Sequence, residues 1–382
     1  MSNHKLIISS AGSGKTTYLV NTALEASSKK VLITTYTENN QKEIKNKFID
    51  VRGFVPNNVT IQTWFSFLIQ HGVKPFQGSL WEPLYDHDIK GMILVNKKSG
   101  MKYYDKKLKR PVYFGEDNPN KFYFGKGYIY SDKLAKMVVN TNSSSEGKVV
   151  SRISRIYDHI MIDEVQDLAG YDLDLIKLLM KDCSNITMVG DPRQVTYLTH
   201  LEARHKKYRE GNIEQFLLEK CKRSIGDNGI DKTTLVNSHR CCAEVCNYAS
   251  KLYSDLPATV TCDCCNTNSD THQGVFLVKP EDVKQYLNAY EPVQLKWNKK
   301  VHINPFYDSQ NFGESKGASH DRVLIYPTEK MTEWIENSID LPNETRAKFY
   351  VAITRARFSV GIIHDYDKDK LYDGLIKYQP EK

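Results

Sequence analysis

Glycine and hydroxyl residues near the start of the chain have the composition of a phosphate-binding loop. The stretch LIISSAGSGKTTYLV, residues 6–20, meets the pattern G-x-x-x-x-G-K-[ST] except that Ser9 replaces the first glycine. In this pattern the backbone N–H groups of a glycine turn and a helix N-terminus surround a polyphosphate. We predict a nucleotide site, with the Lys15 ammonium on the phosphates and the Thr16 hydroxyl on Mg²⁺. The expected binding residues are Ala11, Gly12, Ser13, Gly14, Lys15, Thr16 and Thr17. The alternative is an ordinary strand, turn and helix that happens to contain GSGKT.

Adjacent carboxylates follow an apolar segment in the middle of the chain. The segment HIMIDEVQD, residues 159–167, places Asp163 and Glu164 directly after a predicted strand. One such carboxylate can complete the shell of Mg²⁺, and the next can orient and deprotonate an attacking water. A surface pair of acids is the alternative, but the position downstream of the glycine loop favours the chemical interpretation.

Cations and aromatic residues alternate between residues 90 and 130. Ten basic residues stand against only three acids, Asp105, Glu116 and Asp117, and nine aromatic residues lie among them. Single-stranded nucleic acid is held by this combination, with cations along its backbone and rings under its bases. The alternative is a small β-rich subdomain with aromatic residues in its core and lysines on a solvated face.

The elements that must position these residues are alternating strands and helices. Predicted strands cover residues 31–37, 159–165, 185–191, 322–328 and 358–364. A predicted helix follows the first of these strands, with Ile44 and Phe48 on one face, and an amphipathic helix follows the acidic pair. Such alternation is typical of an α/β fold with parallel sheets, which bind ligands at the carboxyl ends of their strands. Surface loops are expected at residues 140–150 and 261–274.

Length and composition narrow the class of protein. The chain has 382 residues and a net charge of +7, which suits two or three globular domains and a polyanionic partner. We recognise no secretion signal and no apolar run long enough to span a membrane, so we expect a cytoplasmic protein without a membrane partner. The eight cysteines are then expected to be reduced. Cys262, Cys264, Cys265 and His272 invite a zinc interpretation, although their spacing is no recognised pair of knuckles.

An ordered series of motifs resembles the superfamily one helicases of the UvrD/Rep/PcrA type. After AGSGKTT follow TTYTENNQKEIKNKF, IQTWFSF, IDEVQD, VGDPRQVTY, LVNSHR, FGESKGASHDRVLIYPT and ETRAKFYVAITRAR. The resemblance implies two RecA-like domains with ATP between them and translocation on single-stranded DNA in the 3′ to 5′ direction. The implied boundaries are 1–70 with 151–220 for the first domain, 71–150 for a reduced inserted subdomain, and 221–382 for the second domain.

The resemblance also implies a role for each matching residue. Asp163 supports Mg²⁺ together with Thr16, Glu164 is the general base, and Gln194 senses the γ-phosphate. Two arginine fingers are implied, and planar cations suit the charge that develops on a transferring phosphoryl group. The fingers are Arg240 and Arg355, and the implied DNA-binding residues are Thr37, Thr63, Tyr197 and Lys316.

Departures from the family pattern leave three functions open. Thr199 stands where the family has an aromatic residue that stacks on a base, and the chain has no room before Lys5 for an adenine-reading glutamine, which leaves base selectivity open. The GDPRQ and SKGASHDRVLIYPT segments resemble those of the helicase-like subunits encoded beside an OLD-type nuclease in Gabija anti-phage systems. The chain is therefore interpreted as a DNA-translocating ATPase, as an ATP-dependent switch that binds DNA ends and controls a partner nuclease, or as a degenerate binding module.

Overall fold

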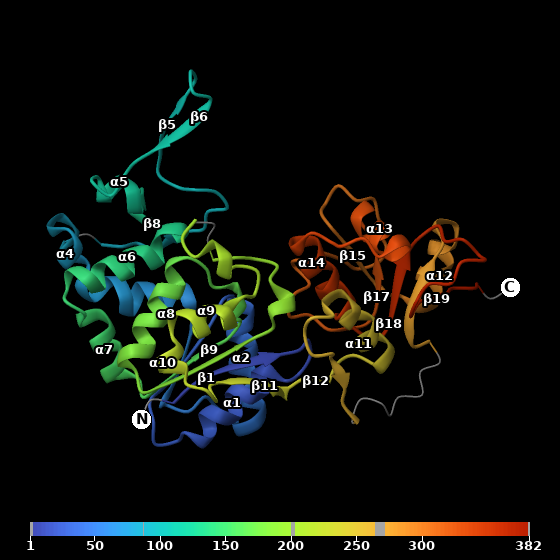
Figure 1. Ribbon diagram of the computed structural model, residues 1–382, viewed down its shortest axis with the longest axis horizontal. Coiled ribbons are helices and arrows are strands. Elements are labelled where there is room, and N and C mark those ends of the chain that lie inside the picture. Colours follow the sequence, from blue (N-terminus) through green and yellow to red (C-terminus); the bar gives the residue numbers. More distant parts are fainter. Residues whose placement is uncertain (1–2, 87, 200–202, 264–271, 381–382) are drawn as a thin grey trace. The chain divides into compact units, whose positions relative to one another are not determined.

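The computed structural model describes residues 3–86, 88–199, 203–263 and 272–380 (Figure 1). The chain divides into two compact units, each of which combines helices with strands. Unit 1 contains the residues up to Ile7 together with Thr16–Gly190 and Leu198–Asp231, and unit 2 contains Ile8–Lys15, Asp191–Tyr197 and Lys232–Lys382.

A six-stranded sheet contains the strand that leads into the glycine loop. Its order is β11-β1-β10-β9-β2-β3, and the pairs β10–β9, β9–β2 and β2–β3 are parallel. In β2 all five residues are buried, as expected for a strand in the interior of a parallel sheet. The strands are β1 Asn3–Ser9, β2 Val31–Thr35, β3 Val59–Thr63, β9 His159–Ile162, β10 Asn185–Gly190 and β11 Ile230–Leu235. The strands predicted near residues 31, 159 and 185 are confirmed.

The helices of unit 1 follow the apolar periodicity of the sequence. Helix α2, Glu38–Arg52, begins at the capping residue Thr37 and buries Ile44 and Phe48, as predicted. The predicted amphipathic helix after the acidic pair is α8, Tyr171–Asp182. The remaining helices of this unit are α1 Lys15–Glu25, α3 Trp64–Phe67, α4 Gln77–Leu80, α5 Pro119–Tyr123, α6 Ser131–Ser144, α7 Lys148–Ile156, α9 Ile213–Lys220 and α10 Lys222–Ile225.

The basic aromatic segment forms two small sheets within unit 1. Strands β5, Met101–Asp105, and β6, Arg110–Tyr113, pair as an antiparallel hairpin that extends away from α5 and α6 in Figure 1. The second sheet has the order β4-β8-β7 and consists of β4 Met92–Ile93, β7 Phe124–Gly125 and β8 Tyr128–Tyr130. Phe122, Tyr123 and Phe124 are buried, as the interpretation of a β-rich subdomain predicts, while Tyr103 and Tyr104 are exposed. Binding of nucleic acid by this segment stays a prediction.

The prediction of a surface loop at residues 140–150 is wrong for most of this range, because the residues are helical. Helix α6 continues to Ser144 and α7 begins at Lys148. The small polar side chains satisfy their hydrogen bonds on the helices themselves. The Ser144 hydroxyl donates to the Thr141 carbonyl at 3.2 Å, and the Asn142 carboxamide oxygen accepts from the Val150 N–H at 3.0 Å. Their polarity therefore does not require a loop.

Unit 2 contains a six-stranded sheet in which every neighbouring pair is parallel. The order is β16-β15-β17-β18-β14-β19, and β17 and β18 confirm the strands predicted near residues 322 and 358. The strands are β14 Gly274–Val278, β15 Val293–Lys296, β16 Ser309–Asn311, β17 His320–Ile325, β18 Ala356–Ile363 and β19 Ile376–Lys377, with the separate pair β12 Asn237–Ser238 and β13 Val260–Thr261. The helices are α11 Ala243–Ser250, α12 Val283–Tyr290, α13 Glu329–Asn337 and α14 Asn343–Ile353.

The α/β class with two largely parallel sheets is thus confirmed, while the domain boundaries drawn from the sequence stay a prediction. Among the described residues, no helix has the length and apolar character needed to cross a membrane.

Candidate active site

The glycine loop follows β1 and leads into α1, as the motif predicts. Gly12 and Gly14 have φ angles of 72° and 82°, which favour glycine. A Cβ atom on Gly12 would lie 2.7 Å from the Cβ of Arg240, so only glycine permits this approach. The Gly12 carbonyl accepts a hydrogen bond from the N–H of His239 at 2.8 Å. Within unit 2 the loop therefore packs directly against the LVNSHR motif.

Hydroxyl groups around the loop carry hydrogen-bonding capacity that the protein does not use. The side-chain oxygens of Ser9 and Ser13 are buried and have no hydrogen-bond partner among the described residues. The N–H of Ser13 donates to the Ser10 carbonyl at 3.3 Å, which closes the turn, and Ala11 belongs to the apolar core of unit 2. A buried polar atom without a partner is costly, so these hydroxyls suit a polar ligand.

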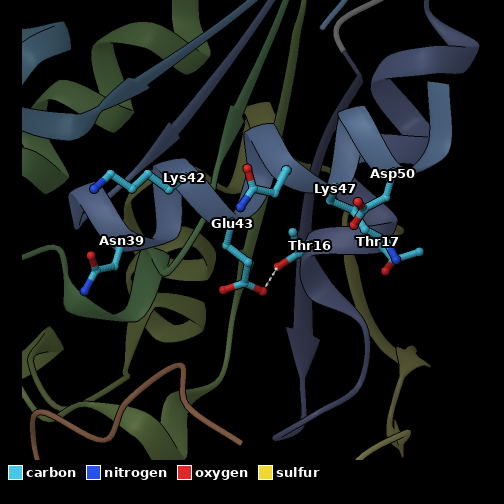
Figure 2. A pocket seen from close by; sticks show the side chains of 8 residues that line it. Thr16, Thr17, Asn39, Lys42, Glu43, Lys47 and Asp50 are labelled. Atoms are coloured by element: carbon cyan, nitrogen blue, oxygen red, sulfur yellow. Dashed lines mark hydrogen bonds between the residues drawn. The ribbon is translucent and has the colours of Figure 1, made fainter. Parts of the chain in front are cut away.

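The first turn of α1 and the face of α2 form a pocket of about 410 Å³, which includes Thr16 and Thr17 (Figure 2). The Thr16 hydroxyl donates to the Glu43 carboxylate at 3.0 Å. Because the proton is directed to Glu43, lone pairs of the hydroxyl oxygen remain available for a cation. Glu43 was not predicted as a site residue, and its only sequence signal was its place within the TTYTENNQKEIKNKF motif.

The acidic pair, Asp163 and Glu164, lies at the carboxyl end of β9, and different neighbours hold the two side chains. The Asp163 N–H donates to the Thr34 carbonyl at 2.8 Å, and its carboxylate accepts from the Thr35 hydroxyl at 3.1 Å. Glu164 has a φ of 53°, a left-handed conformation that is uncommon for glutamate. Such strain is characteristic of functional positions, where the surroundings hold a side chain in one direction.

Gln166 and Gly190 fix the direction of the Glu164 side chain. The Gln166 carboxamide donates to the Glu164 carboxylate, and both residues are buried. A Cβ atom on Gly190 would lie only 2.3 Å from the Gln166 side-chain oxygen. The glycine at the end of β10 therefore makes room for the glutamine that holds the predicted base.

Within unit 2, a buried network joins the GDPRQ segment to Ser9 before the glycine loop. Arg193 forms an ion pair with Asp191 at 3.1 Å and donates to the Ser9 carbonyl at 3.2 Å. Asp191 also accepts from the Gln194 carboxamide at 2.8 Å. Arg193 was not predicted as a site residue. Its role depends on contact with a residue 184 positions away, which no local pattern reveals.

Arg355 joins three of the predicted motifs within unit 2. One guanidinium nitrogen donates to the Gln194 side-chain oxygen at 3.3 Å, and another donates to the Ala318 carbonyl at 3.2 Å. The Nε atom donates to the Val351 carbonyl at 3.0 Å, and the side chain is only 1 % exposed. The planar group is thus held in one orientation by acceptors on several segments.

Arg240 converges on the same region as Arg355. Its guanidinium donates to the Thr354 carbonyl at 3.2 Å, directly before Arg355 in the chain. Its N–H donates to the Ser238 hydroxyl at 3.3 Å. The two predicted fingers and the Gly12 turn are therefore neighbours within one unit.

Two of the predicted DNA-binding residues cap helices at adjacent strand ends. The Thr37 hydroxyl accepts from the Asn40 N–H at 3.1 Å at the start of α2. The Thr63 hydroxyl accepts from the Ser66 N–H at 3.2 Å at the start of α3. Capping explains these threonines without a ligand, so their contact with DNA stays a prediction.

The other two predicted DNA-binding residues lie together in unit 2. Tyr197 is 44 % exposed, and its hydroxyl would be 2.5 Å from a Cβ atom on Gly313. The Lys316 N–H closes the turn onto the Gly313 carbonyl at 3.3 Å. The exposed tyrosine and the half-buried lysine therefore flank one glycine turn, an arrangement compatible with a nucleic-acid contact.

Thr199 has a structural function in place of the aromatic residue that the family carries there. Its hydroxyl accepts from the Ala169 N–H at 3.0 Å, and its own N–H donates to the Asp167 carbonyl at 2.9 Å. The side chain is buried. Thr199 thus fixes the loop after the acidic pair, and it offers no surface to a base.

The cysteine cluster gives no metal site among the described residues. Cys241, Cys242, Cys246 and Cys262 are buried, and no group of three potential metal ligands occurs in the described part of the chain. Cys264 and Cys265 lie outside the described residues. His272 stacks between Phe276 and Tyr290, with ring centroids 3.9 and 3.7 Å apart, as a packed side chain.

Comparison with known proteins identifies one family match and a larger set of similar solved structures. Residues 102–220 match the UvrD/REP helicase N-terminal domain. Over these residues the chain is therefore similar to UvrD/REP helicases. No curated protein matches the chain.

Two of the similar solved structures are of Arterivirus nonstructural protein 10, a helicase, one of them in complex with DNA. Their sequence identities to this chain are 16 % and 14 %, and their TM-scores are 0.45 and 0.46. Each alignment covers 96 % of this chain but only 60 % and 62 % of the other, so the chain spans less than two thirds of their length.

The helicase family implies ATP and a divalent metal, and the residues present fit both groups. The unpartnered hydroxyls of Ser9 and Ser13 suit a phosphate, and the Thr16 oxygen and the Asp163 carboxylate are the hard oxygen ligands that Mg²⁺ prefers.

Proposed function

We propose that this chain is a DNA-dependent ATPase of the UvrD-like helicase type that translocates on single-stranded DNA in the 3′ to 5′ direction. The observation that supports it most is the cluster in unit 2. There Gly12 of the phosphate loop contacts Arg240, and Gln194 accepts a hydrogen bond from Arg355. A chain that only bound a nucleotide would have no use for two oriented guanidinium groups beside the loop.

In this proposal the loop binds ATP through its backbone N–H groups and Lys15, while Thr16 and Asp163 hold Mg²⁺, which neutralises phosphate charge when it is bound. Glu164 accepts the proton of the attacking water, in the direction that Gln166 fixes. Arg240 and Arg355 stabilise the charge on the transferring phosphoryl group. Gln194 contacts Arg355 and also belongs to the segment that leads to Tyr197, so it would connect hydrolysis with the DNA-binding turn.

Single-stranded DNA is proposed to contact residues at the strand ends and at the glycine turn, namely Thr37, Thr63, Tyr197 and Lys316. The exposed lysines and tyrosines of the β5–β6 hairpin would add a second contact. Net charge favours this partner, because phosphate neutralisation supplies much of the affinity for nucleic acid.

Thr199 favours a second candidate function. With no aromatic residue at this position, one stacking contact that a translocating enzyme would use is replaced by a buried hydrogen bond. The chain would then be an ATP-dependent sensor of DNA that separates few or no strands. The wording of the motifs suggests that such a sensor would control an OLD-type nuclease in anti-phage defence. No family match supports a nuclease partner.

A strand-displacement assay run beside an ATPase assay distinguishes the two candidates. Displacement of a strand from a duplex with a 3′ single-stranded tail, but not from one with a 5′ tail, supports 3′ to 5′ translocation. Stimulated hydrolysis without displacement from either duplex supports the sensor.

A further inference from the structure

A second pocket lies in the inserted segment of unit 1, away from the phosphate loop in sequence. It has a volume of about 460 Å³, within the range of small-molecule sites. The pocket lies at the base of the β5–β6 hairpin, beside α5 and the β7–β8 turn. Its walls combine aromatic rings, an amide and two cations, and these residues are Phe114, Phe124, Tyr130, Asn120, Lys121 and Lys126.

Glycines keep the walls of this pocket close together. The Phe114 N–H donates to the Gly100 carbonyl at 2.9 Å, which joins the end of β6 to the segment before β5. A Cβ atom on Gly125 would lie 2.5 Å from the Tyr130 hydroxyl, and Gly100 has a φ of 71°. The ring of Tyr130 can therefore lie directly over the backbone of β7.

The charge that faces the pocket is exclusively positive. Lys121 and Lys126 are exposed, and neither forms an ion pair within the described part of the chain. Two acids of the same segment are engaged elsewhere. Glu116 binds Lys136 at 2.6 Å, and Asp132 accepts from the Ser99 N–H at 3.0 Å.

We propose that this pocket binds a single nucleotide unit, with its base against the aromatic rings and its phosphate on Lys121 and Lys126. Aromatic faces stack on any base, and lysine ammonium groups bind phosphate as point charges. The Asn120 carboxamide offers a donor and an acceptor to the polar edge of the base. An apolar ligand would leave both cations unused, and a carboxylate alone would leave the rings unused.

This chemistry is shared by a free nucleotide and by one nucleotide of a single strand. The site is distinct from the residues proposed for ATP, so it is a second nucleotide site in either case. Where the nucleotide belongs to a strand, the inference rests on the proposed function, and the inserted segment then holds the strand by one base.

The test uses the full chain with Lys15→Ala, which removes the lysine contact to phosphate at the phosphate loop. Binding of AMP and of a labelled oligothymidylate of about 12 nucleotides is measured by titration, since sites of this kind cover about 4–16 nucleotides. Two pocket variants are compared, Phe114→Leu and the double variant Lys121→Gln/Lys126→Gln. Matched controls are Phe54→Leu and Lys45→Gln, both exposed residues of unit 1 outside the pocket.

We expect each pocket variant to weaken binding by about fivefold or more, the lower end of the loss for one stacked base. The controls should bind within about twofold of the parent, which is well below that loss. If the pocket variants weaken binding of the oligothymidylate alone, the site holds a nucleotide of a strand. If they weaken binding of AMP, the site holds a free nucleotide. Unchanged binding of both probes in both pocket variants would overturn the inference.

A crosslinking measurement locates the bound nucleotide directly, so its result does not depend on the affinity of other DNA contacts. An oligothymidylate that contains 4-thiothymidine should crosslink on irradiation to a peptide from residues 113–130, and Phe114→Leu should reduce this product. Absence of any crosslink to this peptide, while the oligonucleotide remains bound, would exclude a strand nucleotide from the pocket. Failure of DNA to stimulate ATP hydrolysis, with AMP binding still sensitive to the pocket variants, would reject the proposed function and leave the pocket assignment intact.

Discussion

A guanidinium nitrogen of Arg355 donates a hydrogen bond to the side-chain oxygen of Gln194 at 3.3 Å, across 161 residues of sequence. Gln194 is held in turn by Asp191, and Asp191 by Arg193, which also binds the carbonyl of Ser9. Three buried side chains therefore form a continuous series of contacts between Ser9 and the predicted arginine finger.

Replacement of Arg355 should affect turnover far more than nucleotide binding. We expect Arg355→Ala to lower kcat by about 10³-fold, because an arginine finger acts mainly on the transition state. Steady-state kinetics and nucleotide titration measure the two effects. Arg357→Ala, two residues away on an exposed ion pair with Asp321, is the matched control and should change kcat by less than about twofold. Equal losses of affinity and of kcat would make Arg355 a ground-state contact.

Removal of the predicted base should separate hydrolysis from binding. Glu164→Gln should lower hydrolysis by about 10²-fold or more while ATP remains bound, because the phosphate contacts are unchanged. Glu25→Gln, an exposed carboxylate in the last turn of α1, serves as the control. If Glu164→Gln retains more than about a tenth of the parent rate, the general base is another residue.

The contact between Gly190 and Gln166 gives a prediction on stability. Gly190→Ala should destabilise the protein by about 1–3 kcal/mol, since the new methyl group overlaps the Gln166 side chain. Urea unfolding measures the loss. In the background of Gln166→Ala the same substitution should cost less, because the side-chain oxygen at 2.3 Å is gone while the Val165 side chain remains at 3.0 Å. Equal costs in the two backgrounds would show that Gln166 does not determine the need for glycine.

His159 gives a pH dependence with a definite sign. Burial, and then the charge of Lys29, lower the pKa of His159 to about 4. The unfolded chain then binds more protons than the folded chain between about pH 4 and pH 6.5, so stability increases with pH in this window. The stability that the folded state gains from a neutral His159 is fully present above about pH 6.5, and it is lost as the pH falls toward 4. The slope is at most about 1.4 kcal/mol per pH unit, and partial exposure reduces it.

His159→Gln should remove this part of the slope, because glutamine can still bind the Thr187 hydroxyl but does not titrate. Unfolding free energies at about pH 5 and about pH 7 measure it. His302→Gln, at an exposed position, should leave the slope as it is. A slope unaffected by His159→Gln would assign the pH dependence to other groups.

The turn of the β5–β6 hairpin should contribute to the salt dependence of DNA binding. Lys106, Lys107, Lys109 and Arg110 are exposed, so alanine at all four should flatten the log–log slope of affinity for single-stranded DNA against salt. Each phosphate contact contributes about −0.7 to that slope. The basal ATPase rate should survive. An unchanged slope would remove the hairpin from the DNA path.

Local patterns predicted those parts of the molecule that depend on neighbours in sequence. Strand β2, helix α2 and the glycine loop follow from apolar periodicity and from the φ angles that glycine permits. The helices at residues 140–150 were missed because Ser144 and Asn142 satisfy their polar groups on backbone atoms, which composition alone does not reveal.

The sequence predicted those site residues that belong to a recognisable motif. It did not predict residues whose role depends on contacts between distant parts of the chain. Arg193 and Glu43 act through partners that only the fold brings to them, Ser9 and Thr16. The substitution at Thr199 was visible in the sequence, but its function was not, because the two backbone groups that it binds come from the loop after the acidic pair.

The central claim is that DNA controls hydrolysis at the phosphate loop. The most direct test is the steady-state rate of ATP hydrolysis with Mg²⁺, measured with and without single-stranded DNA, for the parent chain and for Lys15→Ala. We expect DNA to raise the rate of the parent chain about tenfold or more, which corresponds to about 1.4 kcal/mol of transition-state stabilisation, and Lys15→Ala to be inactive under both conditions. A parent rate that is the same with and without DNA would contradict the account.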